Sequence, residues 1–216
     1  MFHIHGMSLS FNTTKVIYVA EELGVDFKYT VVDLSKGENK SPEHMARHPL
    51  GKLPTLDHDG KKLFESAAIC QYMAAVEKSP LLPTDIYQRA LVDQWMNYMS
   101  IHLGRWIGSL LFERYVRKAF GMGEINKDAE KEALGFIEQQ MAVVDKQLAA
   151  NKFIAGDALT IADPHAFAYI ETAPMCELSL EPYPNVQRWL DTYAARPAAN
   201  RAQERLGRNR SNKAAV

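Results

Sequence analysis

The sequence predicts an α/β domain followed by an all-helical domain, and three observations support this order. Over residues 1–76, strand-like and helical runs follow one another in the order βαβαββα. Two prolines, Pro80 and Pro83, then interrupt the pattern within 77–87, which is the expected linker. Beyond it apolar residues recur at helical spacing, so 88–216 is expected to form the helical domain.

The first elements follow from alternation of side chains and from breaker residues. Gly24 is expected to end the first helix, because glycine readily adopts the left-handed backbone that follows a helix. A strand, a helix and a strand this close together imply a right-handed βαβ unit. In chain order we expect a strand over 2–5, a loop over 6–10, a helix over 11–23, a strand over 27–34, a loop over 35–39 and a short helix from Ser41 to about His48.

The stretch from Gly51 to Tyr72 predicts a hairpin and the helix that follows it. The first strand, the turn, the second strand and the helix N-cap are expected at 53–56, 57–60, 61–64 and Ser66. Pro54 has no N–H to donate to a neighbouring strand, so it suits a strand start. We predict a cis bond between Leu53 and Pro54, with the backbone N–H and C=O of Leu53 free to pair with an extended ligand.

The second half predicts helical segments and a polar tail. A long amphipathic run, either one helix or two broken near Gly104 or Gly108, precedes a helix whose apolar stripe includes Phe136. Thr160 and Asp163 are expected to form a capping box, in which each side chain bonds a backbone N–H of the helix start. The expected segments are helices over 88–120, 127–149, 160–170 and 185–194, a short connection over 153–156, and a tail over 201–216 that is mobile or folds over the active site.

Composition excludes several classes of protein. The 216 residues, 47% of them hydrophobic, can bury a substantial core, and a net charge of -1 gives no general attraction to nucleic acid or anionic membranes. No apolar run can span a bilayer and no leader segment opens the chain, so a cytoplasmic protein is expected. Cys70 and Cys176 are far apart and form no Cys-x-x-Cys pair, and His3 and His5 alternate on a strand. No disulfide and no metal site are therefore expected.

Glu65 and Ser66 bring chemistry to the helix that follows the hairpin. A helix N-terminus has unpaired N–H groups and partial positive charge, and a serine hydroxyl beside it completes a site for a carboxylate. Glu65 can accept a ligand ammonium, so the pair would suit an α-amino acid end group. The alternative is an ordinary N-cap next to a solvated glutamate.

The stretch LPTLDHDGKKLFESAAICQY resembles the glutathione-binding half of the cytosolic glutathione transferases. Its spacing is most similar to that of the phi-type and related bacterial serine enzymes, and the resemblance covers essentially the whole chain. It implies a thioredoxin-like first domain and glutathione as co-substrate. It also implies a homodimer that buries the helices following Ser66 and Gln88.

The resemblance assigns the glutathione contacts residue by residue. The implied contacts are Asn39, Lys40, Lys52, Leu53, Glu65 and Ser66. The backbone of Leu53 would pair with the cysteinyl part, Glu65 and Ser66 would hold the γ-glutamyl end, and the two lysines would face the glycyl carboxylate. The chain departs from the phi-type pattern at Asn39, where a histidine is usual, and at Lys52, where a glutamine is usual.

Ser10 is the expected catalytic residue. Glutathione chemistry needs a thiolate, and a hydroxyl that donates a hydrogen bond to sulfur at a helix N-terminus favours that anion. In the phi-type pattern the catalytic serine lies four residues after the glycine that closes the first strand, and Gly6 and Ser10 reproduce this spacing. Ser8 is the competitor, Asn12 is a third candidate, and a simple N-cap role for Ser10 is the alternative.

The expected reaction is conjugation of the thiolate to a small hydrophobic electrophile in a site between the domains. Its candidate walls are Met7, Leu9, Phe11, Tyr98, His102, Trp106 and Tyr115, whose spacing also fits an ordinary helical core. One alternative is a glutathione-dependent peroxidase, lyase or reductase, and another is a noncatalytic binding module of the same fold. The absence of a cysteine at Ser8 or Ser10 argues against thiol-disulfide chemistry.

Overall fold

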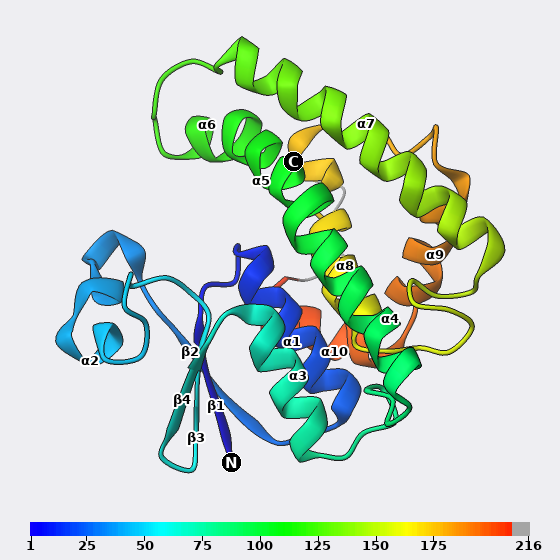
Figure 1. The fold of residues 1–216 in the computed structure, drawn as a ribbon. Coiled ribbons are helices and arrows are strands. Elements are labelled where there is room, and N and C mark those ends of the chain that lie inside the picture. The colour runs from blue at the N-terminus through cyan, green and yellow to red at the C-terminus, as the bar shows by residue number, and fades with distance from the viewer. Residues whose placement is uncertain (209–216) are drawn as a thin grey trace. The chain divides into compact units, whose positions relative to one another are not determined.

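The computed structural model describes residues 1–208, and the chain divides into two compact units (Figure 1). Among the described residues, the first unit contains Met1–Leu82 and residues 194–208, and the second contains Pro83–Tyr193. The sequence predicted that all of 88–216 belongs to the helical domain. In the structure, the segment that follows Tyr193 belongs to the first unit instead. Arg210 and Lys213 of the expected tail lie outside the described residues.

The first unit is built on a four-stranded sheet in the order β2-β1-β3-β4. Its central strand β1 (Phe2–Gly6) pairs in parallel with β2 (Phe27–Val31) and antiparallel with β3 (Thr55–His58). A hairpin joins β3 to the antiparallel edge strand β4 (Lys61–Phe64). A βαβ unit followed by a hairpin confirms the thioredoxin-like class.

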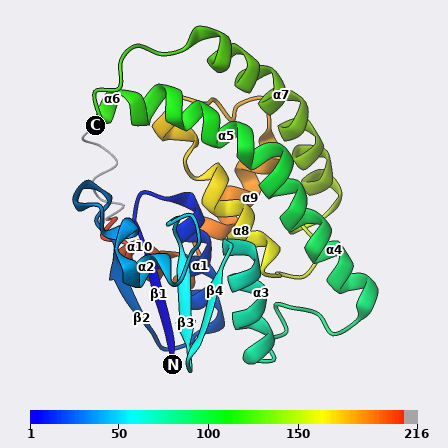
Figure 2. The same cartoon turned by 60° about the vertical axis from the view of Figure 1, so that its left-hand side comes forward.

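Helices α1 (Phe11–Leu23) and α3 (Ser66–Val76) lie side by side against the sheet, as Figures 1 and 2 show. Successive strand residues point to opposite faces, so Phe2 and Ile4 of β1 face the same core. Gly24 ends α1 in the left-handed conformation, with φ 67°, as the sequence predicts.

Three boundaries in this unit differ from the sequence prediction. β2 ends at Val31, because the Asp33 carboxylate accepts hydrogen bonds from the N–H (2.9 Å) and hydroxyl (2.6 Å) of Ser35 and starts a 3-10 turn. The short helix α2 (Pro42–Met45) ends before His48. Ser66 is the first residue of α3 and not its N-cap, because Glu65 occupies the cap position without a capping side-chain bond.

A further helix, α10 (Pro197–Arg205), follows the last helix that the periodicity predicts. It packs on α1 through small side chains, since Ala198, Ala199 and Ala202 are buried. Arg201 and Arg205 both donate to the Glu21 carboxylate at 2.8 Å. The expectation of a mobile tail is therefore wrong for this part of 201–216: a stripe of alanines gives no hydrophobic signal, and the partner carboxylate lies 180 positions earlier.

In the second unit the backbone stays helical from Ile86 to Ala119. Two π-helical turns, Tyr98–Leu103 and Phe112–Val116, join α4 (Ile86–Asn97), α5 (Gly104–Leu111) and α6 (Arg117–Ala119). No break occurs near Gly104 or Gly108 in this described stretch. A Cβ at Gly104 would lie 2.4 Å from the ring of Tyr169, so this glycine permits close packing of helices instead of ending one.

The remaining helices of this unit are α7 (Lys127–Ala150), α8 (Ala162–Ile170) and α9 (Pro184–Ala194). The predicted stripe of α7 is buried at Ala133, Ile137, Met141, Val144 and Leu148. Phe136 departs from it, because its side chain is 37% exposed and stacks on Trp106 of α5 at 4.3 Å between ring centroids. Helix α8 is buried along its whole length and forms the centre of the unit.

Asp163 organises the start of α8. Its Oδ2 accepts from the N–H of Thr160 at 3.0 Å, which confirms the expected reach of the aspartate to that N–H. The Thr160 hydroxyl accepts from the N–H of Ala162, two positions on and not three, because the helix begins one residue later than a capping box would place it. The other carboxylate oxygen accepts from the N–H of Ile154 at 2.9 Å and from Trp189 Nε1 at 3.0 Å.

Within residues 1–208, no helix combines the length and the apolarity that crossing a membrane requires.

We predict that Asp163→Ala lowers the free energy of unfolding by about 3 kcal/mol, because two buried backbone N–H groups and the Trp189 indole lose their acceptor. Urea unfolding at pH 7 measures this difference. Asp157→Ala, on the exposed connection nearby, is the matched control and should leave the midpoint within experimental error. An Asp163→Ala midpoint equal to that of the wild type would show that these bonds contribute nothing to stability.

Candidate active site

Ser10 lies at the N-terminus of α1, at the end of the loop that follows β1. Its backbone is extended, its N–H donates to the Met7 carbonyl at 3.0 Å, and its own carbonyl accepts from Thr14 at 2.9 Å. The hydroxyl makes no capping hydrogen bond, although serine is a favoured capping residue. A half-buried hydroxyl thus remains for a ligand at a helix end that carries partial positive charge.

The loop before Ser10 is held against α1 by Thr13. The N–H of Met7 donates to the Thr13 hydroxyl at 3.1 Å. A Cβ at Gly6 would lie 2.3 Å from the Thr13 methyl group, so only glycine allows this approach. Gly6 therefore allows the loop to pack closely against α1, and this packing brings the chain from the end of β1 to Ser10 within four residues.

The two competitors of Ser10 are already engaged. Ser8 Oγ lies 3.4 Å from the hydroxyl of Tyr29, and the Ser8 carbonyl accepts from the guanidinium of Arg208. The side-chain oxygen of Asn12 accepts from Lys15 Nζ at 2.7 Å, which leaves its N–H₂ group as the donor. Of the three candidate side chains, that of Ser10 forms the fewest hydrogen bonds with the described residues.

Lys15 is a charged residue of this region that the sequence reasoning missed. It lies on α1 with 1% of its surface exposed, and its ammonium stands 5.5 Å from the centre of the Phe11 ring. Burial lowers the pKa of Lys15 from 10.5 to about 7, while Cys70 and Glu65 act in the opposite direction. The available sequence signal was a lysine next to the apolar run that contains Val16, Ile17 and Val19, within the helix predicted over 11–23.

The hairpin presents the backbone expected to pair with a peptide. The Leu53–Pro54 bond is cis, as the sequence predicts. Among the described residues, neither the N–H nor the C=O of Leu53 has a hydrogen-bond partner. Next to it in sequence, the carbonyl of Lys52 accepts from His44 Nε2 at 3.0 Å.

Glu65 and Ser66 stand at the N-terminus of α3. Glu65 has a positive φ of 69°, which is uncommon for a residue with a side chain, and its carboxylate is exposed. Ser66 is buried at the first position of the helix. The pair therefore combines an exposed carboxylate with a hydroxyl and unpaired N–H groups at a helix end, the donors and acceptors that an amino acid end group needs.

The cationic part of the predicted site is tied to the loop before the hairpin. Asn39 Nδ2 donates to the Gly51 carbonyl at 2.9 Å, and Lys40 Nζ donates to the Leu50 carbonyl at 3.0 Å. The side chain of Lys52 is exposed and forms no hydrogen bond or ion pair with the described residues. Asn39 and Lys40 thus have a structural role in this state, and Lys52 is the cation with the greatest freedom to meet an anion.

The predicted substrate walls fall into two sets, one in each unit. In the first unit, Met7 and Phe11 are half-buried and Leu9 is 46% exposed, all beside Ser10 in sequence. In the second unit, Tyr98 directs its hydroxyl to Gln140, with Oε1 at 2.7 Å, and Trp106 stacks on Phe136. Tyr98 and Trp106 therefore take part in helix packing, while His102 is exposed and Tyr115 is half-buried.

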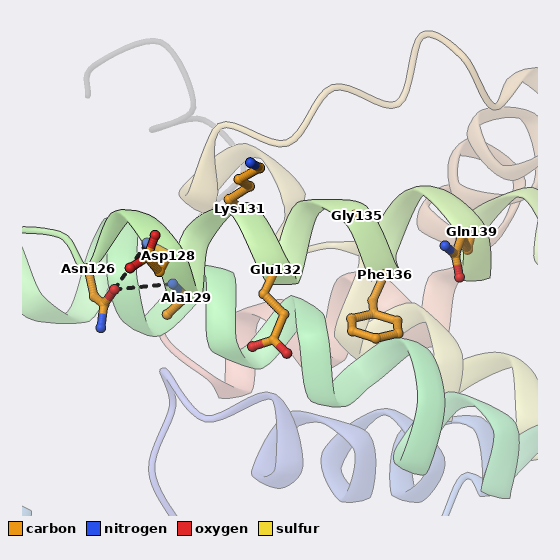
Figure 3. A pocket seen from close by; sticks show the side chains of 8 residues that line it. All are labelled: Asn126, Asp128, Ala129, Lys131, Glu132, Gly135, Phe136 and Gln139. Atoms are coloured by element: carbon orange, nitrogen blue, oxygen red, sulfur yellow. Dashed lines mark hydrogen bonds between the residues drawn. The ribbon is translucent and has the colours of Figure 1, made fainter.

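A hollow of about 680 Å³ lies on the exposed side of α7, within the second unit (Figure 3). Its residues all come from one helix and its N-cap: Asn126, Asp128, Ala129, Lys131, Glu132, Gly135, Phe136 and Gln139. Figure 3 shows Glu132 and Phe136 on the same side of α7, and the Asn126 side chain bonded to the N–H groups of the first turn. None of the predicted site residues lines this hollow, so its shape alone does not make it the active site.

Family models match both halves of the chain. Residues 2–75 match the glutathione S-transferase N-terminal domain, and residues 105–197 match the glutathione S-transferase C-terminal domain. These two ranges together include most of the sequence.

Individual relatives are similar over almost their whole length. Glutathione S-transferase 3 of Zea mays is 36% identical over 204 residues, which cover 90% of each chain. The probable glutathione S-transferase GSTF2 of Oryza sativa subsp. japonica is 31% identical over 202 residues, 92% of this chain and 94% of the relative. A solved structure of glutathione S-transferase-I bound with lactoylglutathione is 28% identical with a TM-score of 0.86, and the match covers 94% of this chain and 98% of that one.

We predict that the unfolding free energy of the wild type rises relative to that of Lys15→Met by about 2 kcal/mol between pH 7 and pH 9. The pKa of Lys15 is lowered to about 7 in the folded protein, so over this range the unfolded chain binds more protons than the folded one, and stability rises with pH. Urea unfolding of both proteins at several pH values measures this slope.

The control for this prediction is Lys146→Met, which removes an exposed lysine of α7 and should leave the slope of the wild type unchanged. Any constant cost of losing the bond from Lys15 to Asn12 cancels, because only the change with pH is compared. Parallel curves for the wild type and Lys15→Met would rule out a depressed lysine pKa.

Proposed function

The chain belongs to the glutathione S-transferase superfamily as a phi-like glutathione transferase, and from this premise we propose that Ser10 stabilises the thiolate of glutathione for attack on a small hydrophobic electrophile. The free hydroxyl of Ser10 at the N-terminus of α1 is the observation that carries the proposal. A thiol with an ordinary pKa near ~8.5 is only a few per cent ionised at neutral pH. A hydroxyl donor and a helix dipole both favour the ionised form, and neither has to lose a proton itself.

The proposed step is a nucleophilic attack with a simple balance of bonds. The sulfur of glutathione donates an electron pair to an electrophilic carbon, and the new C–S bond forms as the leaving group or π bond accepts the pair. The Ser10 O–H bond stays intact, because the hydroxyl only donates a hydrogen bond to the sulfur anion. The electrophile is proposed to be apolar, because Met7, Leu9 and Phe11 flank Ser10.

The other glutathione contacts are proposed from the donors and acceptors that the hairpin and α3 provide. An extended tripeptide can pair with the two unpartnered backbone groups of Leu53. Its γ-glutamyl ammonium and carboxylate match Glu65 and the helix end at Ser66. The exposed ammonium of Lys52 is proposed to meet the glycyl carboxylate, with Lys40 as a second cation if it releases the Leu50 carbonyl.

The cysteines support conjugation over thiol-disulfide exchange. Both are buried and free, and burial raises the pKa of Cys70 to about 12 and that of Cys176 to about 11. Neither thiol is therefore a nucleophile near neutral pH. A reductase that forms a mixed disulfide with its own cysteine would need an accessible thiolate, which these two residues do not provide.

We predict that Ser10→Ala binds glutathione but leaves the pKa of the bound thiol near its free value of ~8.5, whereas the wild type lowers it. The ultraviolet absorbance of the bound thiolate, followed as the pH is varied, measures this pKa. The rate constant kcat/KM for an electrophilic aryl halide should fall about 10- to 100-fold, because a hydrogen bond to a charged group contributes about 1.5–3 kcal/mol.

Ser8→Ala is the matched control, because it removes a hydroxyl of the same loop that lies near Tyr29. It should keep a lowered thiol pKa. If the pKa of the bound thiol stays near its free value in Ser8→Ala but is lowered in Ser10→Ala as in the wild type, the catalytic role belongs to Ser8. If neither variant differs from the wild type, a hydroxyl donor to sulfur is not the mechanism.

A cytoplasmic homodimer is the proposed state of the protein, with the start of α4 as one contact. Ile86 is 86% exposed and Tyr87 is 68% exposed, although both have large apolar side chains. We predict that sedimentation equilibrium at micromolar concentration gives about twice the chain mass of 24.4 kDa. A particle of 24.4 kDa under those conditions would contradict the dimer.

A further inference from the structure

The outer face of the sheet carries a cluster of two histidines and an aspartate. His3 and His5 lie two residues apart on β1, so they share the face opposite to Ile4. The antiparallel register of β1 and β3 places Asp57 directly across from His3. One ligand atom from each of the three side chains lies within 4.8 Å of the other two.

Contacts hold the three side chains of the cluster close together. His5 Nε2 lies 3.1 Å from Asp57 Oδ2, and the rings of His3 and His5 are 4.0 Å apart between centroids. His3 Nε2 lies 2.8 Å from the hydroxyl of Thr30 on β2, which fixes the orientation of its ring. Such partners orient the imidazole ligands of metal sites.

Asp57 has spare capacity as an acceptor. Its Oδ2 receives His5 and also Arg47 Nε, the latter at 2.7 Å. Its Oδ1 is buried and has no hydrogen-bond partner among the described residues. A buried carboxylate oxygen without a donor is costly, because it has lost its water, and a cation would supply the missing contact.

The charges around the cluster allow a cation. Arg47 is matched by two carboxylates, Asp57 and Glu43, and its bond to Glu43 is 2.7 Å long. Lys28, which lies near His3, is exposed to solvent, so its charge is screened. A neutral imidazole is the form of histidine that binds metal ions.

We propose that His3, His5 and Asp57 bind one divalent transition metal ion of the zinc type, on the face of the sheet opposite to the buried Ile4. Two imidazoles and one carboxylate form a donor set that suits Zn²⁺ and its neighbours, with water completing the coordination. The ion would take the place of the hydrogen bond between His5 Nε2 and Asp57, with the imidazole proton of His5 on Nδ1, and would link β1 to β3. The proposal does not depend on the transferase activity, because none of its ligands is assigned to glutathione or electrophile.

The histidines alone, two residues apart, do not predict this site. The sequence expectation of no metal site considered His3 and His5 without Asp57, which stands 52 positions after His5. Only the pairing of β1 with β3 adds the carboxylate and completes a three-ligand set.

Calorimetric titration of Zn²⁺ into the full-length, chelator-stripped protein tests the proposal. The wild type should bind one equivalent per chain, and His3→Ala and Asp57→Asn should each weaken this binding at least about tenfold. His102→Ala, which removes an exposed histidine of the other unit, is the control and should bind as the wild type does. Zinc should also raise the Tm of the wild type and not that of His3→Ala.

Folding of the variants is monitored by far-ultraviolet circular dichroism. His3 is half-buried and makes one side-chain hydrogen bond, so His3→Ala decides the matter even if Asp57→Asn, which also loses part of its bond to Arg47, fails to fold. A wild-type dissociation constant weaker than about 100 µM overturns the proposal. Equal zinc affinity of His3→Ala and the wild type overturns it as well.

Discussion

The burial of helix α1 is the constraint on which the first unit depends. Every residue from Thr13 to Glu21 is buried, so any charge in this segment needs a partner or a shifted pKa. Glu21 is satisfied by two arginines of α10, and Glu22 forms a two-bonded pair with Arg196 at 2.7 and 2.8 Å. The C-terminal segment belongs to the first unit because these carboxylates would otherwise be buried without cations.

The same constraint prepares the candidate active site at the other end of the helix. The ammonium of Lys15 donates to the side-chain oxygen of Asn12 at 2.7 Å, and Asn12 lies two residues after Ser10. With the helix enclosed and the loop bonded to Thr13, the backbone of Ser10 and the helix dipole are fixed before any ligand arrives. Catalysis by electrostatic stabilisation needs this fixed arrangement, because dipoles that must reorient contribute less.

The two faces of the sheet differ in polarity and in what covers them. The inner face buries Phe2 and Ile4 against α1 and α3 and supplies the apolar core. The outer face is polar and half-buried, so its groups must satisfy one another, and His5, Asp57 and Arg47 form a connected set. A single strand, β1, therefore links the core, the polar outer face and the loop that ends at Ser10.

The sequence by itself determined the order of strands and helices, the hairpin, the glycine end of α1 and the position of Ser10 at a helix start. These features arise from periodicity, breaker residues and caps, which act over a few neighbouring residues. Residues 27–34 and Ser66 mark its limit, since local hydrogen bonding and a left-handed Glu65 moved those boundaries by up to three residues.

Only the tertiary structure decided which distant groups meet. It brought the Trp189 indole into a hydrogen bond with Asp163 and the arginines of α10 into ion pairs with Glu21. It also placed Asp57 beside His3 and His5. It also buried Lys15, a charged residue that the sequence patterns had not singled out. The physical reason is that these pairings depend on which surfaces pack together across tens of residues, and no local pattern records the partner of a charge.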